Sequence, residues 1–297
     1  MYSPVTGKPS PVVDSFPVPV VVEGYKKDIG IDVSPYFKGM DELPLYQCPD
    51  TKLRFFYPYS LAGDAAFYTA LEDREAYYSE WKWEYDEAFR VVDAGAKVLD
   101  IGCGRGAFLA KLKSEKQCDV FGLEYNPSAY QVLQERSIPA AMESIEEHSK
   151  GHAGRYDVVS FFQVLEHIGD VKSFMDGAVA SLKKNGLLII AVPNNQPYLF
   201  GNNKYEWLNL PPHHMGWWNR ESLTNLSGFF GLGVQFIRSS PFKDYNNYLD
   251  SLRRTTAITN PGRVPWLDLT RPFRKQWIQL FKNSIPGFFI LAVYRKR

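Results

Sequence analysis

The sequence predicts an α/β fold, a three-layer sandwich in which helices cover both sides of a mostly parallel sheet. From residue 96 onward, short apolar runs alternate with stretches in which apolar residues recur at helical spacing. The run LLIIAV at 187–192 has no polar face, as expected of a strand that is covered on both sides. A glycine-rich stretch, GCGRG at 102–106, joins the first of these strands to a helix. Strands alternating with helices in this way are typical of a parallel sheet between helical layers.

Each element follows from its own local pattern. Strands are expected at 96–101, 119–124, 138–142, 156–162 and 187–192, with helices at 107–114, 128–135 and 171–182. A further helix at 220–230 takes Asn219 as its favoured N-cap, with Ser222 as the alternative. Two last strands, expected at 234–239 and 288–295, complete the sheet.

Two regions lie outside this alternating pattern. Residues 1–92 form an N-terminal extension, with a short edge strand or loop at 18–23 and one or two helices at 64–92. Residues 93–297 form the ligand-binding domain, interrupted by an arginine-rich insertion at 241–286. An amphipathic helix at 271–289 could make peripheral contact with a membrane, but packing against the domain is the favoured interpretation.

The composition excludes several classes of protein. The 297 residues include 34 Lys plus Arg and 33 Asp plus Glu, and the net charge of +1 gives no electrostatic case for a nucleic-acid partner. The three cysteines, Cys48, Cys103 and Cys118, form no Cys-x-x-Cys pair, so a disulfide framework is not expected. We find no signal-peptide pattern and no run of 18 apolar residues, and therefore expect a cytoplasmic protein without a transmembrane segment. The sequence does not encode the oligomeric state.

The stretch VLDIGCGRG at 98–106 is typical of a strand that turns sharply into a helix. Gly102 and Gly104 let the backbone approach a ligand, and the helix that follows presents N–H groups to an anion. The glycines also satisfy the Rossmann pattern G-x-G-x-x-A, so both a dinucleotide pyrophosphate and the methionine carboxylate of S-adenosylmethionine (SAM) fit the loop. Asp100 at the strand end favours SAM, because a carboxylate there can meet an ammonium group. Glu124 at the end of the next strand can accept hydrogen bonds from ribose hydroxyls.

These residues and several later segments resemble the class I SAM-dependent methyltransferases. The segments are VLDIGCGRG at 98–106, GLEYNP at 122–127, YDVVSFFQVLEHIGD at 156–170, KKNGLLIIAVPN at 183–194 and PPHHMGWWNRESL at 211–223. The resemblance covers about residues 96–240. It implies a Rossmann-like, seven-stranded sheet whose last strand runs antiparallel to the others, with FFILAVYRK at 288–296 as that strand.

The resemblance also implies roles for single residues. Asp100, Gly102 and Gly104 would lie against the methionine part of SAM. Glu124 would bind the ribose, with Tyr125 packing beside the adenine. The residues expected at the adenine edge and near the sulfonium are Glu143, Ser144 and Gln163.

The N-terminal region carries a second resemblance. LPLYQCPDTKLRFFYP at 43–58 and the aromatic-rich stretch at 63–88 resemble bacterial methyltransferases linked to surface-polysaccharide and secondary-metabolite gene clusters. Some of those relatives carry a small cysteine-rich zinc module in this region. Only Cys48 remains here, so we do not expect zinc in this region.

Methyl transfer to a hydroxyl requires a proton acceptor, and histidine is the usual one near neutral pH. His213 and His214 follow a strand end in the predicted sheet, and we favour one of them as general base. His167 is a candidate for a substrate role or for a structural hydrogen bond in its turn. Glu166 and these three histidines could instead form a divalent metal site, although we expect no metal because their spacing is not diagnostic. The other two histidines, at positions 148 and 152, are expected to be exposed.

The favoured function is therefore O-methylation of a glycan, a sugar derivative or a related small metabolite, with SAM as methyl donor. The aromatic residues Tyr198, Tyr205, Trp207, Trp217 and Trp218 flank the histidine pair and could pack against a sugar or cover the cofactor, although core filling is the favoured interpretation of the tryptophans. One alternative is an NAD-dependent sugar oxidoreductase or epimerase, but no Tyr-x-x-x-Lys pair follows the fourth or fifth strand. The other alternative is a non-catalytic partner subunit with the same fold.

Overall fold

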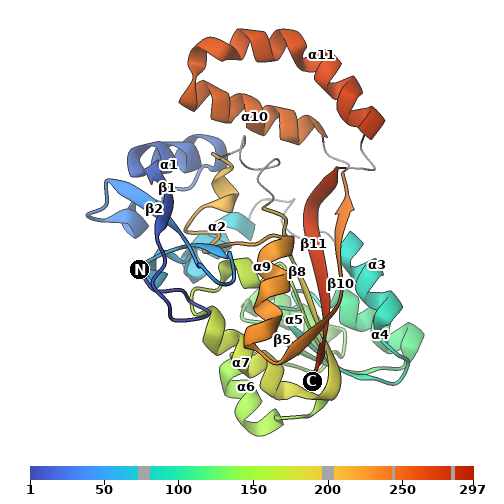
Figure 1. The fold of residues 1–297 in the computed structure, drawn as a ribbon. Coiled ribbons are helices and arrows are strands. Elements are labelled where there is room, and N and C mark those ends of the chain that lie inside the picture. Colours follow the sequence, from blue (N-terminus) through green and yellow to red (C-terminus); the bar gives the residue numbers. More distant parts are fainter. Residues whose placement is uncertain (73–80, 196–203, 243–244, 282–284) are drawn as a thin grey trace.

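The computed structural model describes residues 1–72, 81–195, 204–242, 245–281 and 285–297. Its main sheet has the strand order β10-β11-β8-β7-β4-β5-β6. The strands are β4 (Lys97–Ile101), β5 (Asp119–Leu123), β6 (Ala140–Ala141), β7 (Tyr156–Phe162), β8 (Leu182–Pro193), β10 (Leu232–Pro241) and β11 (Pro286–Lys296). Strand β11 runs antiparallel to β10 and β8 on its two sides, and the other strand pairs of this sheet are parallel (Figure 1). The predicted seven-stranded sheet with an antiparallel last strand is confirmed.

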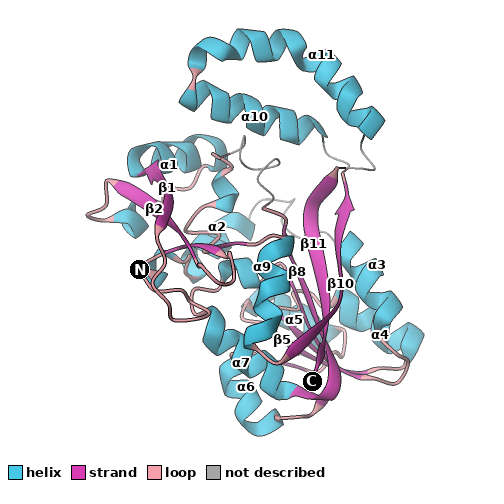
Figure 2. Ribbon diagram, in the orientation of Figure 1, coloured by secondary structure: helices cyan, strands magenta, loops and turns pink. Residues whose placement is uncertain are grey.

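Helices cover both faces of this sheet, as the apolar strands require (Figure 2). One face packs against α3 (Trp83–Val91), α4 (Ala107–Lys116) and α5 (Pro127–Glu135). The other packs against α6 (Ile145–His152), α7 (Val171–Ser181) and α9 (Arg220–Leu226). Successive residues of a strand point to opposite faces, so Ile189 joins the first apolar cluster while Leu188 and Ile190 join the second. The predicted three-layer sandwich is confirmed.

The N-terminal extension forms a second, four-stranded sheet in the order β1-β2-β3-β9. Its strands are β1 (Val12–Pro17), β2 (Glu42–Gln47), β3 (Arg54–Phe56) and β9 (Gly216–Trp217), and helices α1 (Val18–Gly24) and α2 (Ala65–Glu72) lie in the same part of the chain. Strand β9 belongs to the connection that follows β8, about 160 residues after β3 in the sequence. The extension therefore shares its sheet, and its own apolar cluster, with a segment of the ligand-binding domain.

The expected strand or loop at 18–23 is helix α1 in the structure. The β-branched valines of VPVVVE favoured a strand. However, Pro19 lies in the first turn, where a backbone N–H is not needed for the helix. Val18, Val21 and Tyr25 then fall on one buried face at helical spacing. Burial of that face outweighs the local β preference.

Helix α6 was not predicted, and it changes the setting of two histidines. His148 is buried, with 1% of its surface exposed, rather than exposed as the polar sequence around it suggested. Its ring is fixed by contacts of Nδ1 with a Glu143 oxygen at 2.7 Å and of Nε2 with the Tyr156 hydroxyl at 2.8 Å. His152 is partly buried and stacks on His148 with 4.0 Å between ring centroids.

The insertion folds as a hairpin of two helices, α10 (Tyr245–Thr259) and α11 (Val264–Phe281), which lies beyond the ends of β10 and β11 (Figure 1). Helix α11 begins earlier than the expected 271 and ends before β11. The expectation that its apolar side chains pack against the domain is wrong for Trp277 and Leu280, which are 66% and 78% exposed. Trp266, Leu269 and Phe273 are also exposed and share their face at helical spacing.

Other boundaries differ by small amounts from the predictions. Helix α9 ends at Leu226, with a short 3-10 turn after it, and the Asn219 N-cap is confirmed, with Ser222 completing a capping box. The strand expected at 138–142 is limited to Ala140–Ala141. A π-helix spans Tyr25–Ile29, and 3-10 turns span Ser34–Phe37, Tyr59–Leu61, Leu165–His167, Trp207–Asn209, Ser227–Phe229 and Pro261–Arg263. Within the described ranges, no helix is long and apolar enough to cross a membrane.

Replacing Gly24 by alanine tests how tightly the N-terminal extension is joined to the connection after β8. A Cβ on Gly24 would overlap the indole ring of Trp207. We expect Gly24→Ala to lower the free energy of unfolding by about 1–3 kcal/mol, the usual cost of overpacking. Urea unfolding followed by circular dichroism measures the loss.

Gly151→Ala is the matched control, because a Cβ at that helical position meets no atom within 4 Å. It should be neutral or slightly stabilising, since alanine favours a helix. Equal losses in the two variants would contradict close packing at Gly24.

Candidate active site

A glycine turn joins β4 to α4 at the carboxyl end of the sheet. Gly102, Gly104 and Gly106 have φ values of 67°, 53° and 74°, a left-handed conformation that glycine adopts without strain. A Cβ on Gly102 would come within 2.6 Å of a Val164 methyl group. The turn therefore needs glycine for both its conformation and its packing.

Asp100, just before this turn, is a buried carboxylate. Its side chain is 2% exposed and accepts one hydrogen bond, from the Ser160 hydroxyl at 2.7 Å. Burial raises the pKa of Asp100 to about 7, against the lowering effect of Ser160. Among the described residues, no cationic side chain forms an ion pair with it. A ligand with an ammonium group would supply the missing positive charge.

Glu124 occupies the end of the adjacent strand, β5, and is held by backbone groups. Its Oε2 accepts a hydrogen bond from the Gly104 N–H at 2.7 Å, and its Oε1 accepts one from the Asn126 N–H at 2.8 Å. Asn126 caps helix α5, which fixes the loop that carries Glu124. A carboxylate oxygen can accept more than one hydrogen bond, so a carboxylate at this position suits a pair of ribose hydroxyls.

The three residues expected around an adenine lie together. The Tyr125 side chain is 64% exposed, and burial raises its pKa while a hydrogen bond from Ser144 lowers it. Ser144 also caps helix α6, and Glu143 contacts the buried ring of His148. Ser144 and Glu143 thus have structural partners, and the exposed Tyr125 ring is the surface that these residues offer to a flat ligand.

Gln163 directly follows β7 with a left-handed φ of 59°, and its amide donates a hydrogen bond to Glu84 Oε1 at 3.2 Å. Glu84 comes from helix α3 and is only 1% exposed, and burial raises its pKa. Sequence reasoning missed Glu84. Its position in the sequence indicates its burial, because Glu84 lies four residues before Ala88 and therefore on the same, apolar face of this aromatic-rich helix.

The three candidate catalytic histidines form one cluster. His167 ends the short helix after β7, whereas His213 and His214 belong to the connection after β8. The His213 and His214 rings stack with centroids 4.4 Å apart, and the His167 centroid lies 4.7 Å from His213 and 4.9 Å from His214. The Met215 N–H donates to the Glu166 carbonyl at 2.7 Å and joins the two segments. Residues about 47 positions apart in the sequence are thus brought together.

Burial makes these imidazoles weak bases. It lowers the pKa of His167 to about 4 and that of His213 to about 3, and it holds the pKa of His214 well below its usual range. Mutual repulsion adds to the lowering for His213 and His214. All three rings are therefore neutral at pH 7.

Glu166 lies next to the cluster and is 1% exposed. Its Oε1 is 3.9 Å from His167 Nε2, and within the described part of the chain its Oε2 has no hydrogen-bond partner. Burial raises the pKa of Glu166 to about 8, so the acid is protonated at neutral pH unless a cation approaches it. Tyr68 of helix α2 was also missed by sequence reasoning, and its hydroxyl is 3.0 Å from His167 Nδ1.

The aromatic residues near the histidines do not form an open sugar-binding surface. Tyr205, Trp207, Trp217 and Trp218 are all buried, between 0% and 5% exposed. Three of them belong to the apolar core of the N-terminal sheet, and Trp218 belongs to the core of the main sheet. Core filling, the favoured interpretation of the tryptophans, is confirmed for Trp207, Trp217 and Trp218, and Tyr198 lies outside the described residues.

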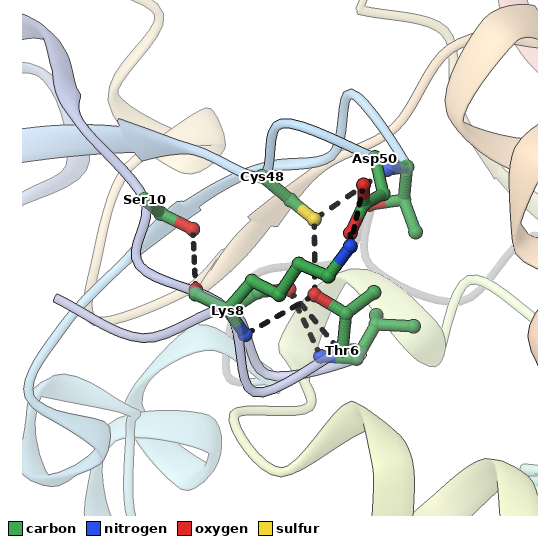
Figure 3. A network of polar contacts seen from close by, with 8 residues as sticks. Thr6, Lys8, Ser10, Cys48 and Asp50 are labelled. Carbon is green, nitrogen blue, oxygen red and sulfur yellow. Dashed lines mark hydrogen bonds and ion pairs between the residues drawn. The ribbon is translucent and has the colours of Figure 1, made fainter.

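Cys48 lies in a polar network of the N-terminal region (Figure 3). Its thiol is 3.6 Å from the Thr6 hydroxyl and accepts a hydrogen bond from the Thr51 N–H at 3.4 Å. Within the described residues, the one group of three potential metal ligands is His167, His213 and His214.

A glycine turn between a buried aspartate and a fixed glutamate, at the carboxyl edge of this sheet, is an arrangement typical of nucleoside-binding α/β domains. Residues 72–235, more than half of the chain, match the family model described as "Methyltransferase domain". The chain belongs to this family, and its fold is that of the class I SAM-dependent methyltransferases. S-adenosylmethionine is the cofactor of this family and fold.

Two further comparisons place the chain among known proteins. It is 32% identical over 106 residues to a ubiquinone biosynthesis O-methyltransferase of Pectobacterium carotovorum, a match that covers 34% of this chain and 44% of the relative. The chain thus spans less than half the length of the curated relatives that it matches.

Solved structures share the fold at low sequence identity. A SAM-dependent methyltransferase from Archaeoglobus fulgidus superposes with a TM-score of 0.54 at 17% identity, covering 78% of this chain and all of that one. A coclaurine N-methyltransferase bound to N-methylheliamine and S-adenosylhomocysteine (SAH) gives a TM-score of 0.50 at 16% identity and covers 75% of each chain.

Replacing Asp100 by asparagine should have opposite effects on cofactor affinity and on stability. Asparagine can keep the Ser160 hydrogen bond but removes the negative charge, so we expect SAH to bind about ten- to a hundredfold more weakly at pH 8, the loss of one charged hydrogen bond. Because the folded-state pKa of Asp100 is raised, wild-type affinity for SAH should rise with pH through about 7, and the variant should show no such rise. Isothermal titration calorimetry between pH 6 and 8.5 measures both.

The ligand-free variant should melt at a higher temperature than the wild type at pH 8, because the buried charge is gone, and the difference should shrink toward pH 4.5. Asp119→Asn, an exposed change at the opposite end of a neighbouring strand, is the matched control and should leave affinity unchanged. Equal affinities for Asp100→Asn and the wild type would exclude Asp100 from the cofactor site.

Proposed function

We propose that this protein transfers a methyl group from SAM to a hydroxyl group of a small molecule, a sugar derivative or a glycan. The arrangement of buried Asp100, the glycine turn and backbone-held Glu124 carries the proposal, within a chain of the methyltransferase domain family. Bound SAM supplies an activated methyl group on a sulfonium centre. Oxygen as the acceptor atom is supported by the O-methyltransferase names of the relatives that are about a third identical over 106 residues.

The chain's own residues would hold the cofactor through complementary charge and hydrogen bonding. Asp100 pairs with the ammonium group of the methionine part, and this positive charge offsets the cost of burying the carboxylate. Glu124 accepts hydrogen bonds from the ribose, and Tyr125 offers an exposed ring beside Glu143 and Ser144 for the adenine. Gln163, held by Glu84, closes the site at the end of β7.

The acceptor side of the site is the histidine cluster. His167, His213 and His214 are neutral and lie on connections at the carboxyl edge of the sheet, where a hydroxyl acceptor would lose its proton. One of them serves as the general base, with His213 and His214 favoured. Their low pKa values mean that this base needs help from a nearby group that favours loss of the hydroxyl proton.

The glycan part of the proposal, and with it a role in polysaccharide biosynthesis, rests on the resemblance of the N-terminal region. That region contributes to the acceptor site in the proposal, since Tyr68 of α2 contacts His167. An NAD-dependent oxidoreductase finds no support in the family match. A non-catalytic subunit would retain SAM binding without methyl transfer.

Thermal denaturation followed by a transfer assay tests this proposal. SAH should raise the melting temperature of the wild-type protein, because it binds only the folded state, whereas NAD at the same concentration should not. Methyl-labelled SAM with a panel of catechols, phenols, nucleotide sugars and oligosaccharides should then label a hydroxyl acceptor. Stabilisation by NAD alone would contradict the cofactor, and SAH binding without transfer to any hydroxyl of the panel would favour the non-catalytic alternative.

The exposed apolar face of α11 supports peripheral contact with an anionic membrane surface. Between residues 245 and 281 the hairpin has six basic side chains and two acidic ones. Arg253 and Arg271 are already paired within the hairpin, with Asp268 and Asp250. An excess of cations beside exposed tryptophan, phenylalanine and leucine is the composition of an interfacial helix. A membrane-bound or lipid-linked acceptor would then be presented near the site.

Sedimentation with vesicles of phosphatidylcholine and phosphatidylglycerol tests the membrane contact. Wild type should bind, and the bound fraction should fall several-fold in Leu269→Ser/Phe273→Ser/Leu280→Ser and in vesicles without phosphatidylglycerol. Phe229→Ser, an exposed change on the 3-10 turn after α9, is the control and should bind as wild type does. Unchanged binding of the triple variant, or a wild-type dimer that the variant loses, would overturn the proposal.

A further inference from the structure

The histidine cluster has the geometry of a metal site as well as that of a proton acceptor. His167, His213 and His214 each offer one ring nitrogen, and these three atoms lie within 4.8 Å of one another. Two nitrogens bound to one tetrahedral zinc ion at about 2.0–2.1 Å lie about 3.4 Å apart. The three ring nitrogens must therefore approach one another by up to about 1.4 Å to bind an ion.

The hydrogen bonds of the rings fix the tautomer of each imidazole. His167 Nδ1 contacts the His213 carbonyl at 2.6 Å, and His213 Nδ1 contacts the Leu208 carbonyl at 2.7 Å. Carbonyl oxygens only accept hydrogen bonds, so Nδ1 carries the proton and Nε2 carries the lone pair in both rings. Outer-shell contacts of this kind fix the tautomer and orientation of metal-binding histidines.

His214 follows the same pattern through a side chain. Its Nδ1 lies 3.1 Å from Asn209 Oδ1, and the Asn209 amide nitrogen donates to Asn195 Oδ1 at 2.7 Å. The amide is thereby oriented with its oxygen toward the ring, which places the proton of His214 on Nδ1. All three imidazoles thus present a basic Nε2.

An acid beside the cluster matches the charge of a bound cation. Glu166 is buried, its Oε1 lies 3.9 Å from His167 Nε2, and no described residue hydrogen-bonds to its Oε2. An unpartnered carboxyl oxygen in the interior is costly, because it loses water without gaining a partner. A divalent cation at the three Nε2 atoms would give this carboxylate a partner.

We propose that His167, His213 and His214 bind a divalent transition metal, with Glu166 as a fourth ligand or as the balancing charge. Imidazole nitrogens with one carboxylate suit Zn²⁺ best among the common ions that are not redox-active.

The metal site would change how an acceptor hydroxyl loses its proton. A metal that polarises this hydroxyl lowers its pKa, and Glu166 would accept the proton in place of a histidine, because all three Nε2 atoms are then bound to the metal. This role rests on the proposed methyl transfer to a hydroxyl. Binding of the metal itself does not, because it requires only the four side chains.

The test uses untagged, full-length protein stripped with a chelator and titrated first with Co²⁺ and then with Zn²⁺. We expect one equivalent of Co²⁺ to produce the visible absorption bands of a tetrahedral nitrogen and oxygen site, and Zn²⁺ to abolish them. His167→Gln and His214→Gln should weaken Zn²⁺ binding by more than about a hundredfold, and Glu166→Gln by about ten- to a hundredfold.

The matched control is His152→Asn, which alters a partly buried, stacked histidine on α6 and should leave metal binding unchanged. Circular dichroism and the melting-temperature shift with SAH are measured on every variant, so loss of folding or of the cofactor site is distinguished from loss of the metal site. If the histidine variants do not fold, the wild-type Co²⁺ spectrum and its response to Zn²⁺ decide the question.

Two outcomes would overturn the metal site. One is wild-type protein that gives no tetrahedral Co²⁺ spectrum, and the other is equal loss of metal binding in His152→Asn and His167→Gln. A metal that binds tightly to protein that does not bind SAH would leave this site intact and would contradict the proposed methyl transfer instead.

Discussion

The backbone of Met215 bridges the two sheets of this protein, and the candidate site depends on that bridge. Its N–H donates to the Glu166 carbonyl at 2.7 Å, and its carbonyl accepts from the Phe56 N–H at 2.9 Å. The first bond ties the connection after β8 to the turn after β7, and the second ties it to β3 of the N-terminal sheet. Because Met215 directly follows His213 and His214, the same two bonds set these rings against His167. The N-terminal extension thus helps to position the histidines as well as covering them.

A second constraint is the concentration of buried acids at this edge of the sheet. Asp100, Glu84 and Glu166 are each 1–2% exposed, and burial raises the pKa of all three. Lys82 is the one described cation that lowers the pKa of every one of them. Buried carboxylates with so few positive charges nearby destabilise a folded protein. Buried acids of this kind are typical of ligand sites, where the ligand supplies the positive charge. An ammonium group at Asp100 and a metal ion at Glu166 would each supply it.

Local patterns predicted most of the fold, because strands covered on both faces are apolar throughout and helices are periodic. Strand β7 lies where its apolar run predicted it, and the Asn219 cap was predicted because a cap acts on its own neighbours. The failures were non-local. Helix α1 forms because Val21 and Tyr25 are buried in the core shared with the connection after β8. His148 is buried because its ring packs on Phe121 and Tyr156 of the main sheet. Glu84 joined the site through Gln163, 79 positions away, and no local pattern encodes that contact.

The histidine cluster is easier to explain as a site for one divalent cation than as a site for several protons. The pKa of His213 is lowered by His167, and that of His214 by both neighbours, so a proton on one ring disfavours a proton on the next. As a proton acceptor the cluster is therefore weaker than a lone histidine. For a metal ion the short distances between the rings are favourable, because three neutral nitrogens bind the same cation. The nearby Glu166 carboxylate balances the charge of that cation. A general base needs only one oriented imidazole. A three-histidine metal site requires all three rings to be held, and here each Nδ1 has a hydrogen-bond partner.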